Sequence, residues 1–428
     1  MNRRAVITGV GVVSPLGIGS QAHWSALIAG RSAVARVDRL TQLGFPVDVG
    51  AEVSGQAVAA CLPRLPKKQV RLYNRATTFA MAAASLAAAD AGITAPVADP
   101  LRAGVILATL FIPYPIQSVL RLLPSAEAAD AHHRVDLGKA MKQCLGGVNP
   151  LDLSLKIVPN LTAGHLAIHF GLRGACRTVA DGWTGGLLAI AQAATAIREG
   201  ALDLAFCGGA ECPLEEMVFA DLCSTELLSP AAASPDRTCR PFGLGRRGTV
   251  AGEGAAVLVL EAEEHAARRG APTRAVCAGF GAAGADPSPE GVRDSLSRAL
   301  RAALDESRRD APDLVSLHGD GSVAGDLGEA TAWQAIAAGA GDWPTLYATK
   351  GAHGNLVSAA GPLEAAGAVM ALERETVPPS RNCEQTDPVC GLSLVADGPR
   401  AVPGMRTAVV SALGAFGEAA CLVLTRDA

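Results

Sequence analysis

The chain has few aromatic residues, which make up 4% of its 428 positions, and it has no strong excess of charge of either sign, with 37 basic and 41 acidic side chains. Lys and Arg never occur in runs longer than two. A protein whose main partner is nucleic acid or an anionic membrane typically shows a concentrated basic segment. We therefore expect neither partner here.

The sequence also lacks the cysteine spacing of a metal or redox motif. Its 11 cysteines include no C-x-x-C pair, and the closest two are Cys207 and Cys212. This spacing argues against a zinc site and against a thiol–disulfide motif. We expect free thiols in a reducing cytoplasm, with no metal and no cofactor.

No apolar run is long enough for a membrane span. The longest, Ala76 to Ala89, ends at Asp90, short of the ~20 residues that a bilayer requires. The N-terminus leads directly into the β-like run Ala5–Gly9 rather than into an apolar leader segment. We expect a cytoplasmic protein in which 76–89 is a buried helix.

Short β-branched runs alternate with helical stretches along the chain, which predicts an α/β fold whose sheets are covered on both faces. The runs lie at 105–107, 178–180, 202–206, 257–260, 314–317 and 409–411. The polar segment Pro124–Gly147 is expected to form a helical insertion on the surface.

One segment is echoed within the chain. Residues 4–11, Arg-Ala-Val-Ile-Thr-Gly-Val-Gly, resemble residues 274–281, Arg-Ala-Val-Cys-Ala-Gly-Phe-Gly. The echo suggests a duplicated α/β unit. It predicts an N-terminal half over 1–265, with a surface insertion near 108–150, and a C-terminal half over 266–428. No linker rich in Pro, Ser or Gly separates the halves, so they should share one core.

Several motifs together resemble the β-ketoacyl-acyl-carrier-protein synthase family. They are the opening run 6–17, Arg240-Pro241-Phe242 followed by the glycine-rich run 252–261, and Gly208-Gly209-Ala210-Glu211. The resemblance covers essentially the whole chain. It implies a thiolase-like duplicated fold, layered α-β-α-β-α with two five-stranded mixed sheets, and an obligate dimer.

A condensing enzyme of this family carries the acyl chain on a cysteine at a strand-to-helix turn, where the helix N-terminus stabilises the thiolate. The resemblance places Trp183 at that position, and tryptophan cannot form a thioester. Cys176, seven residues upstream, is expected to be a structural core thiol. Thr184 is the adjacent hydroxyl, and it would need a neighbouring base to act as a nucleophile.

Two histidines complete the family's site. The first position is His318, although the threonines beside it in the family are here Asp320 and Ser322. Asn355 occupies the second position. His353 lies two residues early, so its recruitment would require a rebuilt backbone.

Two further family positions are retained. Lys350 matches a lysine that orders this region through an ion pair, for which Asp326 or Glu329 is the expected partner. Phe416 occupies the family's pocket gate, but the glycine pair that follows it in the family is lost.

Without the nucleophile and the second histidine, we expect no Claisen condensation by this chain alone. The resemblance then favours the chain-length factor, the non-condensing partner of an active ketosynthase α subunit in type II polyketide synthases. That partner would bring the acyl carrier protein through the complex. Chain-length factors usually carry glutamine where this chain has Trp183.

A tunnel wall at the dimer interface is the expected means of setting product length. The residues expected to form it are Thr109, Leu110, Phe111, Ile112 and Tyr114. These residues could equally serve only as interface packing.

Two alternatives remain open. One is a malonyl-carrier decarboxylase or an acyltransferase of the same fold that uses His318. The other is a catalytically silent homodimer that acts as a scaffold.

Overall fold

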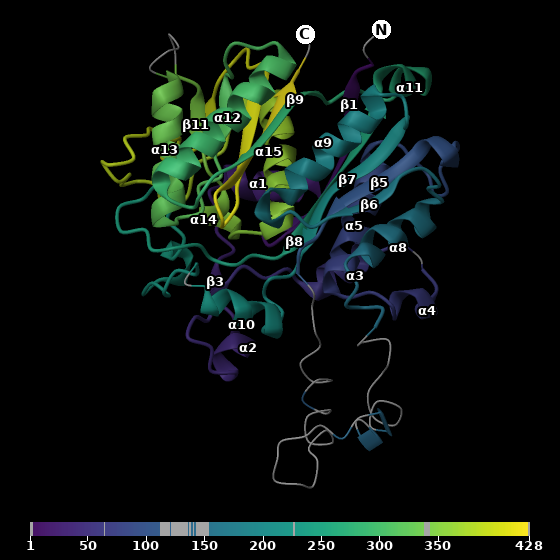
Figure 1. The fold of residues 1–428 in the computed structure, drawn as a ribbon, viewed down its shortest axis with the longest axis horizontal. Helices are drawn as coiled ribbons and strands as arrows, with labels where there is room; N and C mark the ends of the chain where they lie inside the picture. Colours follow the sequence, from purple (N-terminus) through teal and green to yellow (C-terminus); the bar gives the residue numbers. More distant parts are fainter. Residues whose placement is uncertain are drawn as a thin grey trace.

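Two sets of five strands form the centre of the computed structural model, and both follow the same order (Figure 1). The first set contains β1 (Ala5–Ser14), β5 (Ala103–Ala108), β6 (Cys176–Val179), β7 (Leu204–Glu211) and β8 (Gly254–Ala262). The second contains β9 (Ala275–Gly284), β10 (Leu314–Ser316), β11 (Thr345–Tyr347), β14 (Thr407–Leu413) and β15 (Glu418–Thr425). The orders β6-β5-β7-β8-β1 and β11-β10-β14-β15-β9 match strand for strand.

The structure describes residues 3–63, 65–111, 154–225, 227–337 and 343–426, together with residues 120, 136, 138, 139, 141 and 142. The expected insertion near 108–150 therefore lies almost wholly outside the described residues. So do two of the expected tunnel residues, Ile112 and Tyr114.

The two sets meet where the first strand of each half pairs with the other. β1 and β9 are antiparallel, with Val6 opposite Val276 and Ile7 opposite Ala275. These residues belong to the two segments whose similarity was visible in the sequence. This short pairing joins the two five-stranded sets at their edges, so that their strands form one continuous hydrogen-bonded order. The predicted duplicated thiolase-like fold is confirmed.

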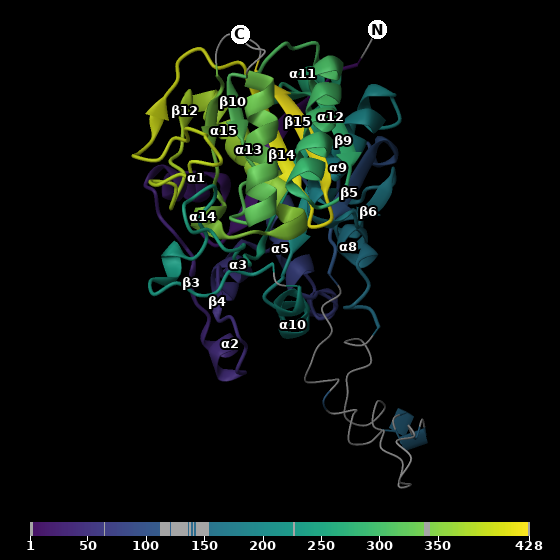
Figure 2. The same cartoon turned by 60° about the vertical axis from the view of Figure 1, so that its left-hand side comes forward.

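Helices cover and separate the two sets of strands in five layers (Figures 1 and 2). The outer helices are α5 (Arg75–Asp90) and α8 (Asn160–Phe170) on the first half, and α12 (Pro289–Ser307) and α13 (Val323–Ala337) on the second. Between the sheets lie α9 (Gly185–Arg198) and α15 (Ala360–Arg374), and each contacts strands of both halves. The layers therefore share one continuous core.

The shorter elements are β2 (Gly17–Ile18), α1 (Ser20–Ile28), β3 (Ala35–Arg36), α2 (Asp38–Gln42), β4 (Val49–Gly50), α3 (Gly55–Cys61), α4 (Lys67–Val70), η1 (Pro100–Arg102), η2 (Gly182–Thr184), α10 (Glu216–Ser224), η3 (Pro235–Arg237), α11 (Glu263–Arg268), α14 (Lys350–His353), η4 (Val357–Ala359), β12 (Thr376–Val377) and β13 (Arg400–Ala401). Among the helices that the structure describes, none is long and apolar enough to cross a bilayer.

Helix α5 shows why this sequence folds into tightly spaced layers. Asn74 caps it by accepting a hydrogen bond of 2.7 Å from the Thr77 backbone N–H. The alanine-rich face of the helix is buried against β1, as the sequence predicted for 76–89. A Cβ at Gly11 of β1 would lie 1.9 Å from the backbone carbonyl oxygen of Ala83, so only glycine permits this spacing.

We predict that Gly11→Ala lowers the free energy of unfolding by about 1–3 kcal/mol, because the added methyl group must push α5 away from β1. The matched control is Gly164→Ala in α8, where a Cβ would meet nothing within 4 Å. Alanine there should leave stability unchanged or raise it by up to about 1 kcal/mol. Urea titration of both variants measures the difference, and equal losses would contradict this account of the layer spacing.

Candidate active site

The turn between β6 and α9 holds the side chain expected at the nucleophile position. After β6 the chain makes the short helix η2, in which Gly182 has a φ of 56°, and then enters α9. Trp183 lies on this turn and is 7% exposed. The strand-to-helix geometry that would present a nucleophile is therefore present, but it presents an indole.

His318 lies directly beside this indole, although it comes from the other half of the chain. The two rings are stacked, with centroids 6.0 Å apart and planes inclined by 25°. His318 follows β10 and is 3% exposed. The backbone N–H of His318 donates to Glu329 Oε1 at 2.8 Å, which fixes where the residue leaves the sheet.

A buried lysine contacts both the backbone and the ring of His318. Lys350 Nζ donates to the carbonyl oxygen of His318 at 2.7 Å, lies 3.3 Å from the ring Nδ1, and forms a fully buried ion pair with Glu364. An ammonium group has three donors and no acceptor, so these three partners use all of its hydrogens. Nδ1 of His318 must then act as an acceptor, which leaves the ring proton on Nε2.

The expected ion-pair partner of Lys350 was Asp326 or Glu329, and this prediction was wrong. Glu364 of α15 is the partner. Glu329 instead accepts hydrogen bonds from the backbone N–H groups of His318 and Gly319. Asp326 accepts from the Phe242 N–H at 2.6 Å, so both carboxylates hold loops rather than the lysine.

Burial controls the ionisation of this cluster. It lowers the pKa of His318 to about 4, because the charged ring would lose its hydration, and the positive charge of Lys350 adds to the effect. Burial also raises the pKa of Glu364 to about 7, although Lys350 opposes that rise. The Asp320 carboxylate, 3.8 Å from His318 Nε2, raises the pKa of the ring but does not outweigh the effect of burial. At neutral pH His318 is therefore a neutral imidazole.

Asn355, at the expected position of the second histidine, lies in a loop that packs on the η2 turn. Its Oδ1 accepts from the Val357 N–H at 2.9 Å, and its buried Nδ2 has no partner among the described residues. Ser358, three residues on, donates to the Gly182 carbonyl at 3.2 Å. The loop thus brings position 355 toward the turn that carries Trp183.

His353 does not take over the role of a second histidine in this geometry. Its ring nitrogens lie 2.7 Å from the Gly354 carbonyl and 3.0 Å from the Thr349 hydroxyl, and the side chain is fully buried. Thr184 is also engaged, because its hydroxyl donates to the Asp181 carbonyl at 2.9 Å.

A pocket of about 480 Å³ opens on the outer side of Trp183. The expected tunnel residues Leu110 and Phe111 line it together with the expected gate, Phe416, which is 79% exposed. Residues of α10, among them Met217 and Leu222, form another wall. Four side chains singled out from the sequence therefore converge on one apolar cavity.

The wall that carries Leu110 and Phe111 is held by a carboxylate that sequence reasoning did not assign. Glu211, at the end of β7, is fully buried and accepts from the backbone N–H groups of Leu110 at 2.8 Å and Phe111 at 3.3 Å. The hydroxyl of Thr109, a third expected tunnel residue, donates to it at 3.5 Å. The feature of the sequence that could have identified Glu211 is its position as an acidic residue at the end of the otherwise apolar run 204–211.

Cys176 contradicts the expectation of a core thiol, because its side chain is exposed. The reason is its place on β6, which pairs only with β5 among the described strands and so lies at a sheet edge. Among the described residues no group of three His, Cys, Asp or Glu side chains could hold a metal ion.

The duplicated fold and the strand-to-helix turn place the chain in the class of thiolase-like folds. Residues 2–266 match the model of the Beta-ketoacyl synthase, N-terminal domain, and residues 274–384 match that of the C-terminal domain. The chain therefore belongs to the beta-ketoacyl synthase family.

Relatives in this family match along nearly the whole chain. The chain is 30% identical to 3-oxoacyl-acyl-carrier-protein synthase 2 of Vibrio cholerae, covering 99% of both proteins. It is 29% identical to the tetracenomycin polyketide synthase ketoacyl synthase alpha subunit of Streptomyces glaucescens, covering 99% of this chain and 98% of that one. Among solved structures, the ishigamide ketosynthase/chain length factor aligns over 100% of both chains, with a TM-score of 0.83 and 28% identity.

We predict that Lys350→Met destabilises the protein by about 3–5 kcal/mol, because it leaves Glu364 buried without its cation. The double variant Lys350→Met/Glu364→Leu should lose less than the single variant, since it removes both charges. A control on the surface, Arg293→Met, breaks the exposed pair with Asp294 and should cost under about 1 kcal/mol. Chemical denaturation compares the three, and a double variant as unstable as the single would contradict the prediction.

Glu211 generates a prediction about pH. Burial raises its pKa to about 7, and the hydrogen bonds that it accepts oppose that rise. A folded-state pKa above the unfolded value means that this group stabilises the fold most below about pH 4.5 and loses that contribution as the pH rises to about 7.

The variant Glu211→Gln lacks this titration. The stability of the parent relative to Glu211→Gln should therefore fall by about 3 kcal/mol between pH 5 and pH 8. Unfolding free energies of both proteins across that range measure it. A constant difference between parent and variant would show that Glu211 does not titrate there.

Proposed function

We propose that this protein is the non-condensing subunit of a type II polyketide ketosynthase, a chain-length factor. It pairs with an active β-ketoacyl synthase, and its apolar pocket limits how far the growing acyl chain extends. The observation that carries the proposal is the stacking of Trp183 on His318 at the turn where a condensing enzyme needs a nucleophile.

The chemistry of condensation explains why the presence of Trp183 at this turn supports a non-condensing role. A thiolate must first take the acyl group from its carrier, forming one thioester as another breaks. Loss of carbon dioxide from a malonyl unit then generates the carbon nucleophile, whose enolate oxygen needs hydrogen-bond donors. Trp183 cannot form the thioester, and Asn355 replaces one of the two expected histidine donors.

The pocket beside Trp183 supports a role in limiting chain length. Its lining is mainly apolar, and the segment with Leu110 and Phe111 is fixed by Glu211 through backbone hydrogen bonds. A wall held by its backbone stops an acyl chain at a defined depth because it cannot yield easily. Side-chain size at position 111 should then set that depth.

An open sheet edge supports pairing with a second chain. β6 has one strand partner among the described residues, and unpaired strand edges readily take up another chain.

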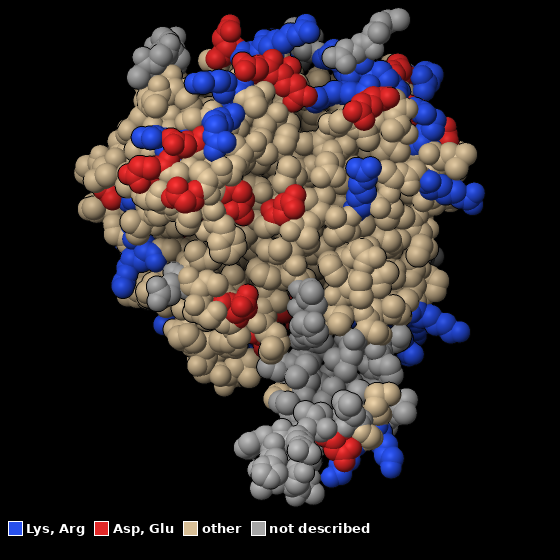
Figure 3. Space-filling model, in the orientation of Figure 1, with Lys and Arg blue, Asp and Glu red and all other residues tan. Residues whose placement is uncertain are grey.

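On the face seen in Figure 3, charged side chains gather toward the edge that holds the termini, and the centre of the face carries few charged side chains. Few charges are typical of the core of a protein interface. The partner we infer is an active ketosynthase α subunit, which would bring the acyl carrier protein through the complex.

The retained His318 keeps decarboxylation or acyl transfer as the second candidate. A catalytic His318 would need access to the substrate, but the indole lies against its ring and Lys350 occupies Nδ1. These contacts favour a structural role for His318, so the first function is preferred.

The decisive experiment measures condensation by the purified chain, alone and with a ketosynthase subunit that has its own cysteine and two histidines. We expect no β-ketoacyl product from the chain alone, and products of defined length from the complex. Phe111→Ala should lengthen the main product by at least one extension unit, because it deepens the pocket. Leu101→Ala, which removes an exposed apolar side chain outside the pocket, is the matched control and should leave length unchanged.

Condensation by the single chain would overturn the proposal. Release of carbon dioxide from a malonyl-carrier by the single chain, abolished in His318→Ala, would favour the second candidate. Trp183→Cys alone should not restore condensation, because Asn355 remains at the second histidine position.

A further inference from the structure

A cluster of arginines lies around two adjoining cavities that the proposed function does not use. One cavity, of about 300 Å³, is lined by Arg237, Arg240 and Arg247 together with Ser229 and Thr238, and no acidic side chain lines it. The second, of about 260 Å³, shares Arg237 and Arg240. We call the first the arginine pocket and the second the amide pocket.

The three guanidinium groups of the arginine pocket have no carboxylate partner among the described residues. Two nearby acids already pair with other arginines: Asp236 lies 3.1 Å from Arg381, and Asp387 lies 2.6 Å from Arg246. A third acid, Glu384, lines only the amide pocket and forms no ion pair with Arg237 or Arg240 among the described residues. Three unneutralised positive charges around one hollow produce a strongly positive local potential. An anion is the ligand that such a potential attracts.

The backbone holds two of these arginines in a fixed relation. Arg237 ends the helix η3, and Arg240 follows three residues later, immediately before Pro241. Arg240 Nε donates to the Arg237 carbonyl at 2.8 Å, which orients its guanidinium. Between them Thr238 and Cys239 are buried and anchor the segment. The Arg240 guanidinium is thus oriented before any ligand binds, whereas Arg237 and Arg247 are exposed and can adjust to the ligand.

Thr238 supplies a buried hydroxyl. Its Oγ1 accepts from the Ala232 N–H at 3.1 Å, so the hydroxyl hydrogen remains available for donation. A phosphate ester has two negative charges and three terminal oxygens, and arginine forks match that geometry. A carboxylate would engage one fork and leave the other two unpaired.

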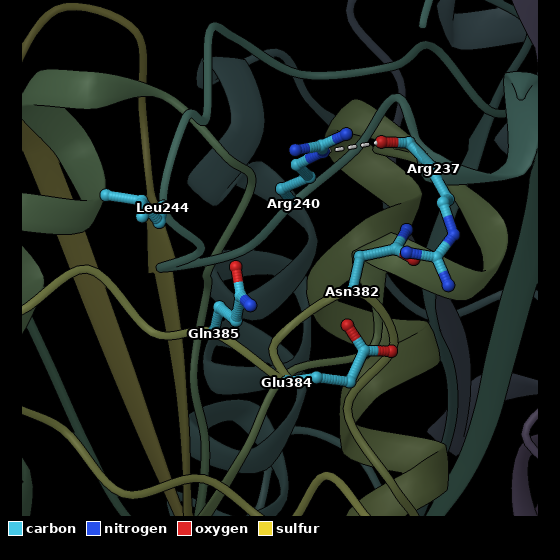
Figure 4. A pocket seen from close by; sticks show the side chains of 6 residues that line it. All are labelled: Arg237, Arg240, Leu244, Asn382, Glu384 and Gln385. Carbon is cyan, nitrogen blue, oxygen red and sulfur yellow. Dashed lines mark hydrogen bonds between the residues drawn. The ribbon is translucent and has the colours of Figure 1, made fainter. Parts of the chain in front are cut away.

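The amide pocket shows what the rest of the ligand would meet. Figure 4 shows the side chains of Arg237 and Arg240 on one side of this cavity and those of Gln385 and Glu384 on the other, with Asn382 between them. Amide groups and a carboxylate donate to and accept from neutral polar groups such as hydroxyls and amides.

We propose that the arginine pocket binds the phosphate group of a phosphate ester, whose hydroxyl or amide groups extend into the amide pocket. None of the residues that line these two pockets also lines the pocket beside Trp183. The phosphate can belong to a free small molecule or be carried on a partner protein, and the chemistry recognised is the same.

Isothermal titration of the full chain with pyrophosphate, glycerol 3-phosphate and a phosphoserine peptide tests the site. Arg240→Gln should weaken binding at least fivefold, because its guanidinium lines both cavities, and rising salt should weaken it further. The matched control is Arg309→Gln, an exposed arginine after α12 that lines neither cavity. It should bind like the parent, and melting temperatures confirm that both variants fold.

The outcomes separate the sources of phosphate. Binding of glycerol 3-phosphate indicates a small-molecule ligand, and binding of the peptide alone indicates a phosphate carried by a protein. The proposal is overturned if no probe gives saturable binding up to about 10 mM, the range expected of a few charge-assisted bonds. It is also overturned if Arg240→Gln and Arg309→Gln weaken binding equally. Neither result bears on chain-length control, which involves another pocket.

Discussion

The constraint on which the site depends is the close approach of one backbone carbonyl to two glycines. The carbonyl oxygen of Ser358 packs against Gly186 of α9 and Gly209 of β7. A Cβ at Gly186 would lie 2.2 Å from this oxygen, and a Cβ at Gly209 would lie 2.4 Å from it. This contact seats the loop from the second half against the helix and strand of the first. Trp183, Asn355 and Glu211 belong to one site only because these three segments touch.

The buried charges around His318 are better explained by this assembly than by chemistry. Lys350 links the His318 backbone to Glu364 of the central helix α15, and Glu329 and Asp326 secure adjacent loops. Removing any one of them would leave a buried charge or backbone N–H without a partner, which is costly. The fold around the site therefore requires Lys350 and His318, whatever residue stands at position 183.

The sequence predicted the repeat and the buried helix at 76–89, because these follow from pattern and from family motifs. It singled out Trp183, Leu110, Phe111 and Phe416 separately, and the structure shows that all four line one pocket. It missed contacts that depend on which of several acids comes nearest. Glu364 rather than Asp326 pairs with Lys350, and Glu211 holds the pocket wall. The exposure of Cys176 was missed for a similar reason, since local pattern does not reveal which strand lies at an edge.

The pairing of β1 has a consequence for synthesis of the protein on the ribosome. β1 is made first, yet it pairs with β8, beginning at Ala5 opposite Ala262, and with β9 at Val276. Apart from Val13 and Ser14, which pair with the short strand β2, its wholly buried residues have no strand partner in the sheet until β8 has left the exit tunnel. Closing so long a loop is slow, because most of its entropy is lost before any contact forms. The nascent N-terminal half thus keeps an apolar strand exposed for most of translation, which makes it a natural client for chaperones.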